Sequence, residues 1–197
     1  MKIIVLMGKT ASGKDTVARY LYSEYGIQPI ISYTTRDRRE SEIDGREHWF
    51  VDDKKMDELL EDKENLLAFM ENPKTGRRYC ASTQGLNKDT TYLYIINPIA
   101  YERMIRDNPD LDTIVIFCDL PEDEIIKRAE ERGDNPDIVK ARLDDERDEF
   151  DSFRKIHFED VKDKPDENSN LYILSTIDKK ETVQKMVSFI LSNAGIK

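Results

Sequence analysis

The hydrophobic pattern of the chain consists of five short apolar stretches, rich in β-branched residues and separated by longer segments of helical periodicity. Within the stretches apolar residues follow one another almost without a break, whereas a strand with one exposed face would alternate apolar and polar residues. Such runs are typical of strands that are covered on both faces in a parallel sheet. The pattern predicts strands at 2–7, 29–32, 92–96, 113–118 and 171–174.

The intervening segments carry apolar residues three and four positions apart, which is the spacing of an amphipathic helix. Val17, Ala18 and Leu21 share one such face, and another segment begins at Pro121, a residue favoured in a first helical turn. Strands that alternate with helices predict an α/β fold, with a parallel sheet flanked by helices and right-handed crossovers. We expect helices at 14–25, 98–106, 121–132, 136–150 and 178–192.

Two segments interrupt this alternation. Residues 33–90 contain a charged run, a short helical pattern at 52–62 and strand-like pieces near 66–70 and 77–80, and they predict an inserted subdomain. Residues 159–170 are polar, acidic and without periodicity, so we interpret them as a solvated loop.

Composition narrows the class of protein. A length of 197 residues suits one domain with an insert, and 41 acidic against 31 basic residues give a net charge of −10. A surface this acidic disfavours non-specific electrostatic binding to nucleic acid or to anionic membranes. The apolar run at 3–7 is too short for a membrane span or a signal peptide, so we expect a cytoplasmic protein. Cys80 and Cys118 are too few for a disulfide framework, and we interpret Cys118 as a buried small hydrophobe.

A glycine-rich loop of sequence GKTASGKDT, residues 8–16, connects the first predicted strand to the first predicted helix. Its backbone N–H groups can converge on phosphate oxygens, the following helix N-terminus favours an anion, and Lys14 can bind the β and γ phosphates. A strand-to-helix turn without a ligand is the alternative interpretation. The expected ATP-binding residues are Gly8, Ala11, Ser12, Gly13, Lys14, Asp15 and Thr16.

The loop departs from G-x-x-x-x-G-K-S/T at its last position. Asp15 stands where a hydroxyl normally binds Mg²⁺, and Thr16 follows immediately. Adenylate kinases, which this stretch also resembles, have Gly and Thr at these two positions, so the departure does not exclude a nucleotide kinase. Asp15 is our candidate Mg²⁺ ligand.

A second candidate anion site lies in residues 32–50, where Arg36, Arg38, Arg39 and Arg46 gather in an otherwise acidic chain. Guanidinium groups bind phosphate oxygens two at a time, and the hydroxyls of neighbouring Ser and Thr residues add neutral donors. The alternative is a solvated charge run in which nearby carboxylates neutralise the arginines.

This segment strongly resembles the GMP-binding segment of the guanylate kinases, S-x-T-T-R-x-x-R-x-x-E-x-D/N-G-x-D/E-Y-x-F. The matching positions are Ser32, Thr34, Thr35, Arg36, Arg39, Glu42, Gly45 and Phe50. Tyr79 resembles the tyrosine of the family's G-x-Y-Y-G-S/T motif, and residues 127–143 resemble its K-R-L-x-x-R-G lid segment with the following I-x-x-R-L. The resemblance covers the chain apart from residues 159–170.

The resemblance implies a single guanylate kinase-like domain of P-loop NTPase type. Its core would be residues 1–32 and 91–197, its subdomain for nucleoside monophosphate (NMP) about 33–90, and its helical lid about 128–147. ATP and Mg²⁺ would serve as phosphate donor and cofactor, and the protein would be a monomer or homodimer. The implied catalytic residues are Lys14, Arg36, Arg128, Arg132 and Arg142, and the implied NMP-binding residues are Ser32, Arg36, Arg39, His48, Glu71, Tyr79, Ser82 and Asn97.

Departures from the family concern the acceptor. His48 replaces the tyrosine that contacts the acceptor phosphate, Cys80 and Ala81 replace Gly-Ser/Thr, and Asn97 replaces an aspartate. Glu71, one residue out of register, is our candidate carboxylate for the paired N–H donors of guanine, which favours GMP or dGMP as acceptor. An NMP kinase of other or broader base preference, and a non-catalytic interaction module, are the alternatives. The complete phosphate loop argues against the module.

Overall fold

The computed structural model describes residues 1–40, 42–158, 170–175 and 180–196, and its centre is a five-stranded parallel sheet. Strand β1 (Lys2–Gly8) is central and pairs in parallel with β7 (Thr91–Ile95) and β8 (Asp112–Cys118). The edges are β2 (Gln28–Pro29) beside β7, and β9 (Leu171–Leu174) beside β8. The loop after β1 and Asn97 after β7 therefore lie at the carboxyl edge of the sheet, where ligands of such sheets bind.

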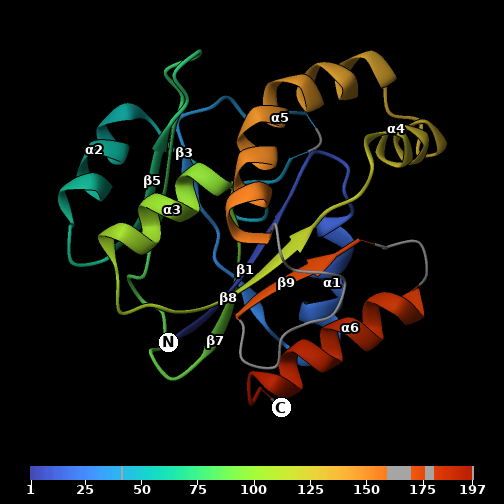
Figure 1. Ribbon diagram of the computed structural model, residues 1–197. Helices are drawn as coiled ribbons and strands as arrows, with labels where there is room; N and C mark the ends of the chain where they lie inside the picture. The colour runs from blue at the N-terminus through green and yellow to red at the C-terminus, as the bar shows by residue number, and fades with distance from the viewer. Residues whose placement is uncertain (41, 159–169, 176–179, 197) are drawn as a thin grey trace.

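Alternate residues of β1 build two cores, because successive side chains of a strand point to opposite faces. Ile4 and Leu6 pack with α1 (Lys14–Tyr25), α4 (Glu122–Glu131), the start of α5 (Pro136–Phe158) and α6 (Lys180–Asn193). Ile3, Val5 and Met7 pack with α3 (Pro98–Asp107) and three phenylalanines of the second half of α5. Helices thus cover both faces of the sheet, and α5 contributes to both cores (Figure 1).

Residues 33–82 build a second sheet with the order β4-β3-β6-β5. Its strands are β3 (Tyr33–Thr34), β4 (Trp49–Phe50), β5 (Leu66–Glu71) and β6 (Arg78–Ser82), and α2 (Asp53–Glu61) covers one face. Asp52 caps α2 by accepting from the Lys55 N–H at 2.8 Å. On the other face, Leu67, Ala68 and Ala81 join the core beneath α3 and fix this sheet to the central one.

The predicted α/β fold with a flanked parallel sheet is confirmed, with differences at the ends of elements. The strand predicted at 29–32 is reduced to β2, and the chain then enters the second sheet at Tyr33. Helix α5 continues to Phe158 because Phe153 and Phe158 are buried against Phe117. Of the loop predicted at 159–170, only residue 170 lies within the described residues, and the predicted start of the last helix at residue 178 lies outside them.

The buried cysteine is confirmed, since Cys118 is 2% exposed and burial raises the pKa of its thiol to about 12. Among the helices in the described part of the chain, none has the length and apolar character needed to cross a bilayer.

Candidate active site

The loop between β1 and α1 has the strained geometry of a phosphate cradle. Gly13 caps α1 in the left-handed region with φ 90°, and Ala11 lies there too, with φ 58°, although L side chains rarely adopt it. A Cβ on Gly8 would lie 2.4 Å from Ser12 Oγ and 2.8 Å from Cys118, so only glycine fits at this position. The Ser12 hydroxyl is fully buried and has no hydrogen-bond partner among the residues that the structure describes. Strain and an unpaired buried hydroxyl together indicate a loop built to hold a ligand.

Lys14, Asp15 and Thr16 begin α1 directly after this loop. The Lys14 ammonium group donates to the Lys9 carbonyl at 3.2 Å, which folds the side chain back over the loop. Asp15 and Thr16 are exposed in the first helical turn. The predicted ATP-binding residues are therefore brought together, and Asp15 presents its carboxylate beside them.

Helix α5 is fastened to the loop by carboxylates. Glu146 accepts from the Thr10 N–H at 2.6 Å and from the Thr10 hydroxyl at 2.7 Å. Lys9 forms ion pairs with Asp151 of α5 at 2.9 Å and with Glu122 of α4 at 3.0 Å. Burial alone would lower the pKa of Lys9, but these ion pairs outweigh burial and raise it. The sequence did not single out any of these contacts.

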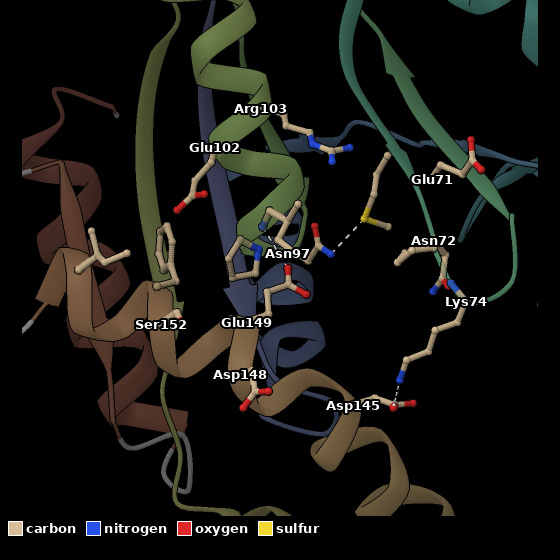
Figure 2. A pocket seen from close by; sticks show the side chains of 16 residues that line it. Glu71, Asn72, Lys74, Asn97, Glu102, Arg103, Asp145, Asp148, Glu149 and Ser152 are labelled. Carbon is tan, nitrogen blue, oxygen red and sulfur yellow. Dashed lines mark hydrogen bonds and ion pairs between the residues drawn. The ribbon is translucent and has the colours of Figure 1, made fainter.

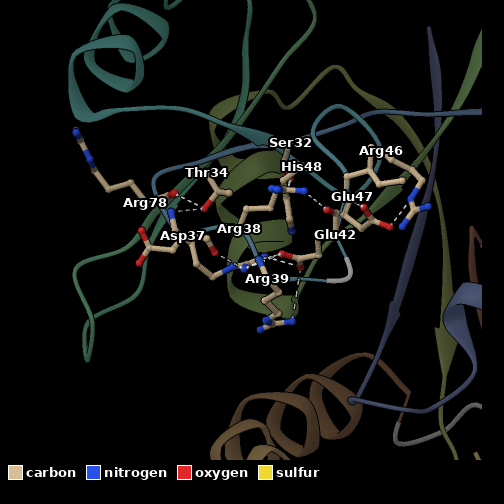
Figure 3. A network of polar contacts seen from close by, with 12 residues as sticks. Ser32, Thr34, Asp37, Arg38, Arg39, Glu42, Arg46, Glu47, His48 and Arg78 are labelled. Carbon is tan, nitrogen blue, oxygen red and sulfur yellow. Dashed lines mark hydrogen bonds and ion pairs between the residues drawn. The ribbon is translucent and has the colours of Figure 1, made fainter.

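A buried carboxylate organises the arginine segment. Glu42 receives Arg36 in a two-pronged ion pair at 2.8 and 3.0 Å and accepts from the Arg39 N–H at 2.8 Å (Figure 3). The ion pair with Arg36 is the main reason that the pKa of Glu42 falls to about 2. Arg36 also lies over the Phe50 ring at 5.5 Å. The alternative of a solvated charge run holds in part: Glu42 neutralises Arg36, as that alternative expects, but the Arg36 side chain is only 16% exposed and therefore is not solvated.

Arg39 and Arg142 interact electrostatically and are less fully neutralised than Arg36. Burial and repulsion from Arg36 and Arg142 lower the pKa of Arg39, although Glu42 approaches it at 3.8 Å. Arg142 is exposed and has no ion pair with any residue in the described ranges. The guanidinium groups of Arg36, Arg39 and Arg142 come from two distant segments and repel one another. A phosphate bound among them would relieve this repulsion.

His48 lies beside this cluster. Its Nδ1 is 2.8 Å from Ser32 Oγ, and its ring centroid is 5.9 Å from that of Tyr79. Burial, followed by repulsion from Arg36, lowers the pKa of His48, so the imidazole is neutral at pH 7. A neutral imidazole has one donor and one acceptor nitrogen, so the nitrogen remote from Ser32 is available to a ligand. Ser32, His48, Tyr79 and Arg36 are therefore brought together as predicted.

A cavity of about 670 Å³ opens between β5, the start of α3 and the middle of α5 (Figure 2). Asn97 lies in its wall, caps α3 by accepting from the Ala100 N–H at 3.0 Å, and donates to the Met70 thioether at 3.2 Å. Glu149 also lines the cavity and accepts from the Ile99 N–H at 3.0 Å. This cavity adjoins the predicted acceptor site through Met70, which pairs with Tyr79.

The register of β5 and β6 does not support the predicted role of Glu71. Glu71 pairs with Arg78, and Arg78 forms ion pairs with Asp53 and Asp57 of α2, on the face away from Tyr79. Glu71 lies at the rim of the cavity with its carboxylate directed away from Asn97 (Figure 2). Directly opposed residues of an antiparallel pair share a face, so Met70 faces the site in place of Glu71.

Three further predicted residues make local contacts. Ser82 is on the face of β6 that carries Arg78, and its hydroxyl accepts from the Gln84 N–H at 3.1 Å. Arg128 forms an ion pair with Glu124 within α4 at 2.8 Å, and Arg132 pairs with Asp134. Of the three arginines expected in the lid, Arg142 is the one whose charge acts on Arg39 and lowers its pKa.

Sequence reasoning missed Glu42, Glu146 and Met70 as site residues. The in-register match of Glu42 with the family motif was a signal that could have identified it. Glu42 was missed because a carboxylate between arginines was expected only to neutralise their charge. Alternation along β5 could have shown Met70 and Glu71 to be on opposite faces. No local signal identifies Glu146, because its contact with Thr10 spans 136 residues.

Comparison with known proteins gives a consistent result. The guanylate kinase family model matches residues 1–160. The guanylate kinase of Thermobifida fusca is 31% identical over 152 residues, which is 73% of this chain and 74% of that protein. The guanylate kinase of Bartonella henselae is 25% identical over 96% of this chain and 85% of that protein. The crystal structure of guanylate kinase from Anaplasma phagocytophilum has a TM-score of 0.60 at 20% identity, covering 96% of this chain and 84% of the other, which supports the fold.

Proposed function

Because the chain belongs to the guanylate kinase family, we propose that it transfers the γ-phosphoryl group of ATP to a nucleoside monophosphate, giving ADP and the nucleoside diphosphate. The proposed acceptor is GMP or dGMP. Phosphoryl transfer needs two anions aligned and their charge neutralised, with little covalent chemistry from the protein.

One observation carries the proposal: a single turn of α5 connects the two anion sites. Glu146 contacts the phosphate loop at Thr10, and Arg142, four residues earlier, lies near Arg39. Residues four apart on a helix share a face and are separated by about 6 Å along its axis. The donor loop and the arginine cluster therefore flank one short segment, as an in-line transfer between two nucleotides requires.

The residues of the site divide the work. The loop would hold the donor phosphates with Lys14 compensating their charge, and Arg36 and Arg39 would hold the acceptor phosphate with His48 and Tyr79 beside it. Arg142 would stabilise the charge on the group in transit. No group of three or more metal-ligating side chains occurs among the described residues, which fits Mg²⁺, an ion usually held by one or two carboxylates together with substrate phosphates. Asp15 would provide the carboxylate, and the ion would neutralise phosphate charge.

A second candidate acceptor follows from Met70. Guanine offers N1–H and its exocyclic amine as adjacent donors, which a carboxylate accepts together, but the neutral Met70 faces the site and Glu71 does not. This observation favours an NMP kinase of broader or different base preference. GMP remains the first candidate because the named relatives are guanylate kinases.

A coupled assay of ADP formation over a panel of NMPs and dNMPs tests both statements. We expect turnover with at least one acceptor and the highest kcat/KM with GMP or dGMP. Arg36→Ala and Arg39→Ala should raise the acceptor KM more than the ATP KM, since each removes a charge-assisted contact to the monophosphate. Best turnover with AMP, CMP or dTMP would shift the proposal to the second candidate, and no turnover with any acceptor would overturn it.

A further inference from the structure

The contact between Glu146 and Thr10 puts a protein carboxylate on the phosphate loop. Both carboxylate oxygens are used, one by the Thr10 N–H at 2.6 Å and the other by the Thr10 hydroxyl at 2.7 Å. Backbone N–H groups of such loops are the donors that bind phosphate oxygens. Glu146 therefore satisfies, from within the chain, a donor of the kind that the nucleotide needs.

The surroundings hold this contact in place. Lys9, adjacent to Thr10 and only 14% exposed at its side chain, forms an ion pair with Asp151 of the same helix. Arg147, adjacent to Glu146, pairs with Glu122 of α4 at 2.7 Å. Glu122 also pairs with Lys9 at 3.0 Å, so the loop is joined to α5 directly through Asp151 and indirectly through Glu122. The Ser12 hydroxyl of the same loop has no partner in the described structure.

We propose that Glu146 is a built-in competitor of the donor phosphates: it occupies Thr10 until ATP arrives, and ATP binding displaces it and frees this turn of α5. This inference rests on the proposed function, because it takes ATP as the ligand of the loop. The phosphates and the Glu146 carboxylate are both negatively charged and both accept from the Thr10 N–H, so they cannot bind it at the same time. Arg142 lies one turn from Glu146, so release of Glu146 allows Arg142 to move with respect to the arginine cluster.

Titration calorimetry of Mg·ATP, and separately of inorganic tripolyphosphate, onto the full chain tests the proposal. Glu146→Gln keeps the shape of the side chain and a carbonyl oxygen for Thr10 but removes the charge. Because hydrogen bonds to charged groups are stronger than neutral ones by about 1 kcal/mol, we expect Kd for both ligands to fall about fivefold. Asp144→Asn is the matched control, since Asp144 is on the same helix, pairs with Arg147 at 2.8 Å and does not touch the loop. Its Kd values should stay within twofold of the parent.

A thermal measurement provides a second readout. Without nucleotide, Glu146→Gln should unfold at a lower temperature than the parent, and saturating ATP should raise its midpoint by more than it raises that of the parent. Unchanged or weaker ATP binding by Glu146→Gln would overturn the proposal and make Glu146 a support of the loop. If the parent phosphorylates an NMP and Glu146→Gln does not bind ATP more tightly, only this inference fails. Tighter ATP binding without transfer to any NMP would instead refute the proposed function.

Discussion

Glu42 and Lys14 carry opposite charges and affect the two ends of the reaction differently. Glu42 is buried and holds Arg36 and Arg39 of the proposed acceptor site, whereas Lys14 of the proposed donor loop donates to the Lys9 carbonyl. A change at Glu42 should therefore affect orientation of the acceptor, and a change at Lys14 should affect stabilisation of the transferred phosphoryl group.

Removing the charge of Lys14 should affect chemistry more than folding. Lys14→Ala should lower kcat by about 10³-fold, because a charge aimed at the transferring phosphate acts mainly in the transition state. Circular dichroism and the thermal midpoint should stay near those of the parent, since among the described residues Lys14 makes a single hydrogen bond, to the Lys9 carbonyl. Activity within a few-fold of the parent would refute the assignment of the donor site.

Neutralising Glu42 should loosen both arginines. Glu42→Gln retains one hydrogen bond to Arg36 but loses the charge, so the acceptor KM should rise about tenfold while the ATP KM changes little. Steady-state kinetics with each substrate varied in turn checks this split. A larger rise in the ATP KM than in the acceptor KM would contradict it.

The same carboxylate predicts a pH dependence of stability. The Arg36 ion pair lowers the pKa of Glu42 from 4.5 to about 2. Because the pKa is lower in the folded state, Glu42 stabilises the fold above pH 4.5, and this contribution is lost as the pH falls toward 2. Chemical denaturation between pH 6 and 2.5 should show a smaller loss of stability for Glu42→Gln than for the parent.

At the scale of elements, the register of β5 with β6 sets which residue would meet the acceptor base in the proposed reaction. Met70 faces Tyr79, and Glu71 faces Arg78. A shift of one residue would exchange the two faces, because side chains alternate along a strand. The base preference is therefore a property of strand pairing, and it can be tested by exchanging the chemistry at these two positions.

Met70→Glu should introduce a carboxylate that accepts the paired N–H donors of guanine. We expect the ratio of kcat/KM for GMP to that for AMP to rise by about tenfold or more, since hydrogen-bonding sites discriminate strongly. Glu71→Gln, the neighbouring control, should leave the ratio unchanged. A fall in the ratio for Glu71→Gln would show that Glu71, despite its register, reads the base.

At the scale of the whole molecule, a net charge of −10 coexists with a local cluster of Arg36, Arg39 and Arg142. The net negative charge repels anionic ligands, so binding of an NMP, as proposed, would depend on this local cluster of arginines. The side chain of Arg39 is 56% exposed, so salt can screen its attraction for a phosphate.

Raising the salt concentration should therefore weaken acceptor binding. Between 0.05 and 0.5 M NaCl, we expect the Kd of the preferred NMP to rise several-fold, because the Debye length falls from above 10 Å to about 4 Å. The matching uncharged nucleoside is the control and should show little change. Equal salt dependence of the NMP and the nucleoside would mean that the arginines do not bind the phosphate.

Short-range patterns of the sequence specify the order of strands and helices and the loop at 8–16, although β2 and the end of α5 differ from the expectation. Continuous apolar runs specified the strands of the parallel sheet, and the loop 8–16 needs only its own glycines, its lysine and the helix that follows. The ion pair of Glu42 with Arg36 is also local, because the two residues are six positions apart, but the sequence did not single it out.

Tertiary structure alone decided which of the remaining candidates share a site. Strand pairing places Met70 on the face of Tyr79, and Glu71 and Ser82 on the opposite face. Arg128 and Arg132 form local ion pairs, whereas the charge of Arg142 acts on Arg39. The contact of Glu146 with Thr10 depends on how α5 packs across the sheet, because Phe150 and Phe153 bury one face of the helix and so fix the direction of the other. Such long-range contacts follow from the burial of a whole helix face, and a short stretch of sequence does not include both partners.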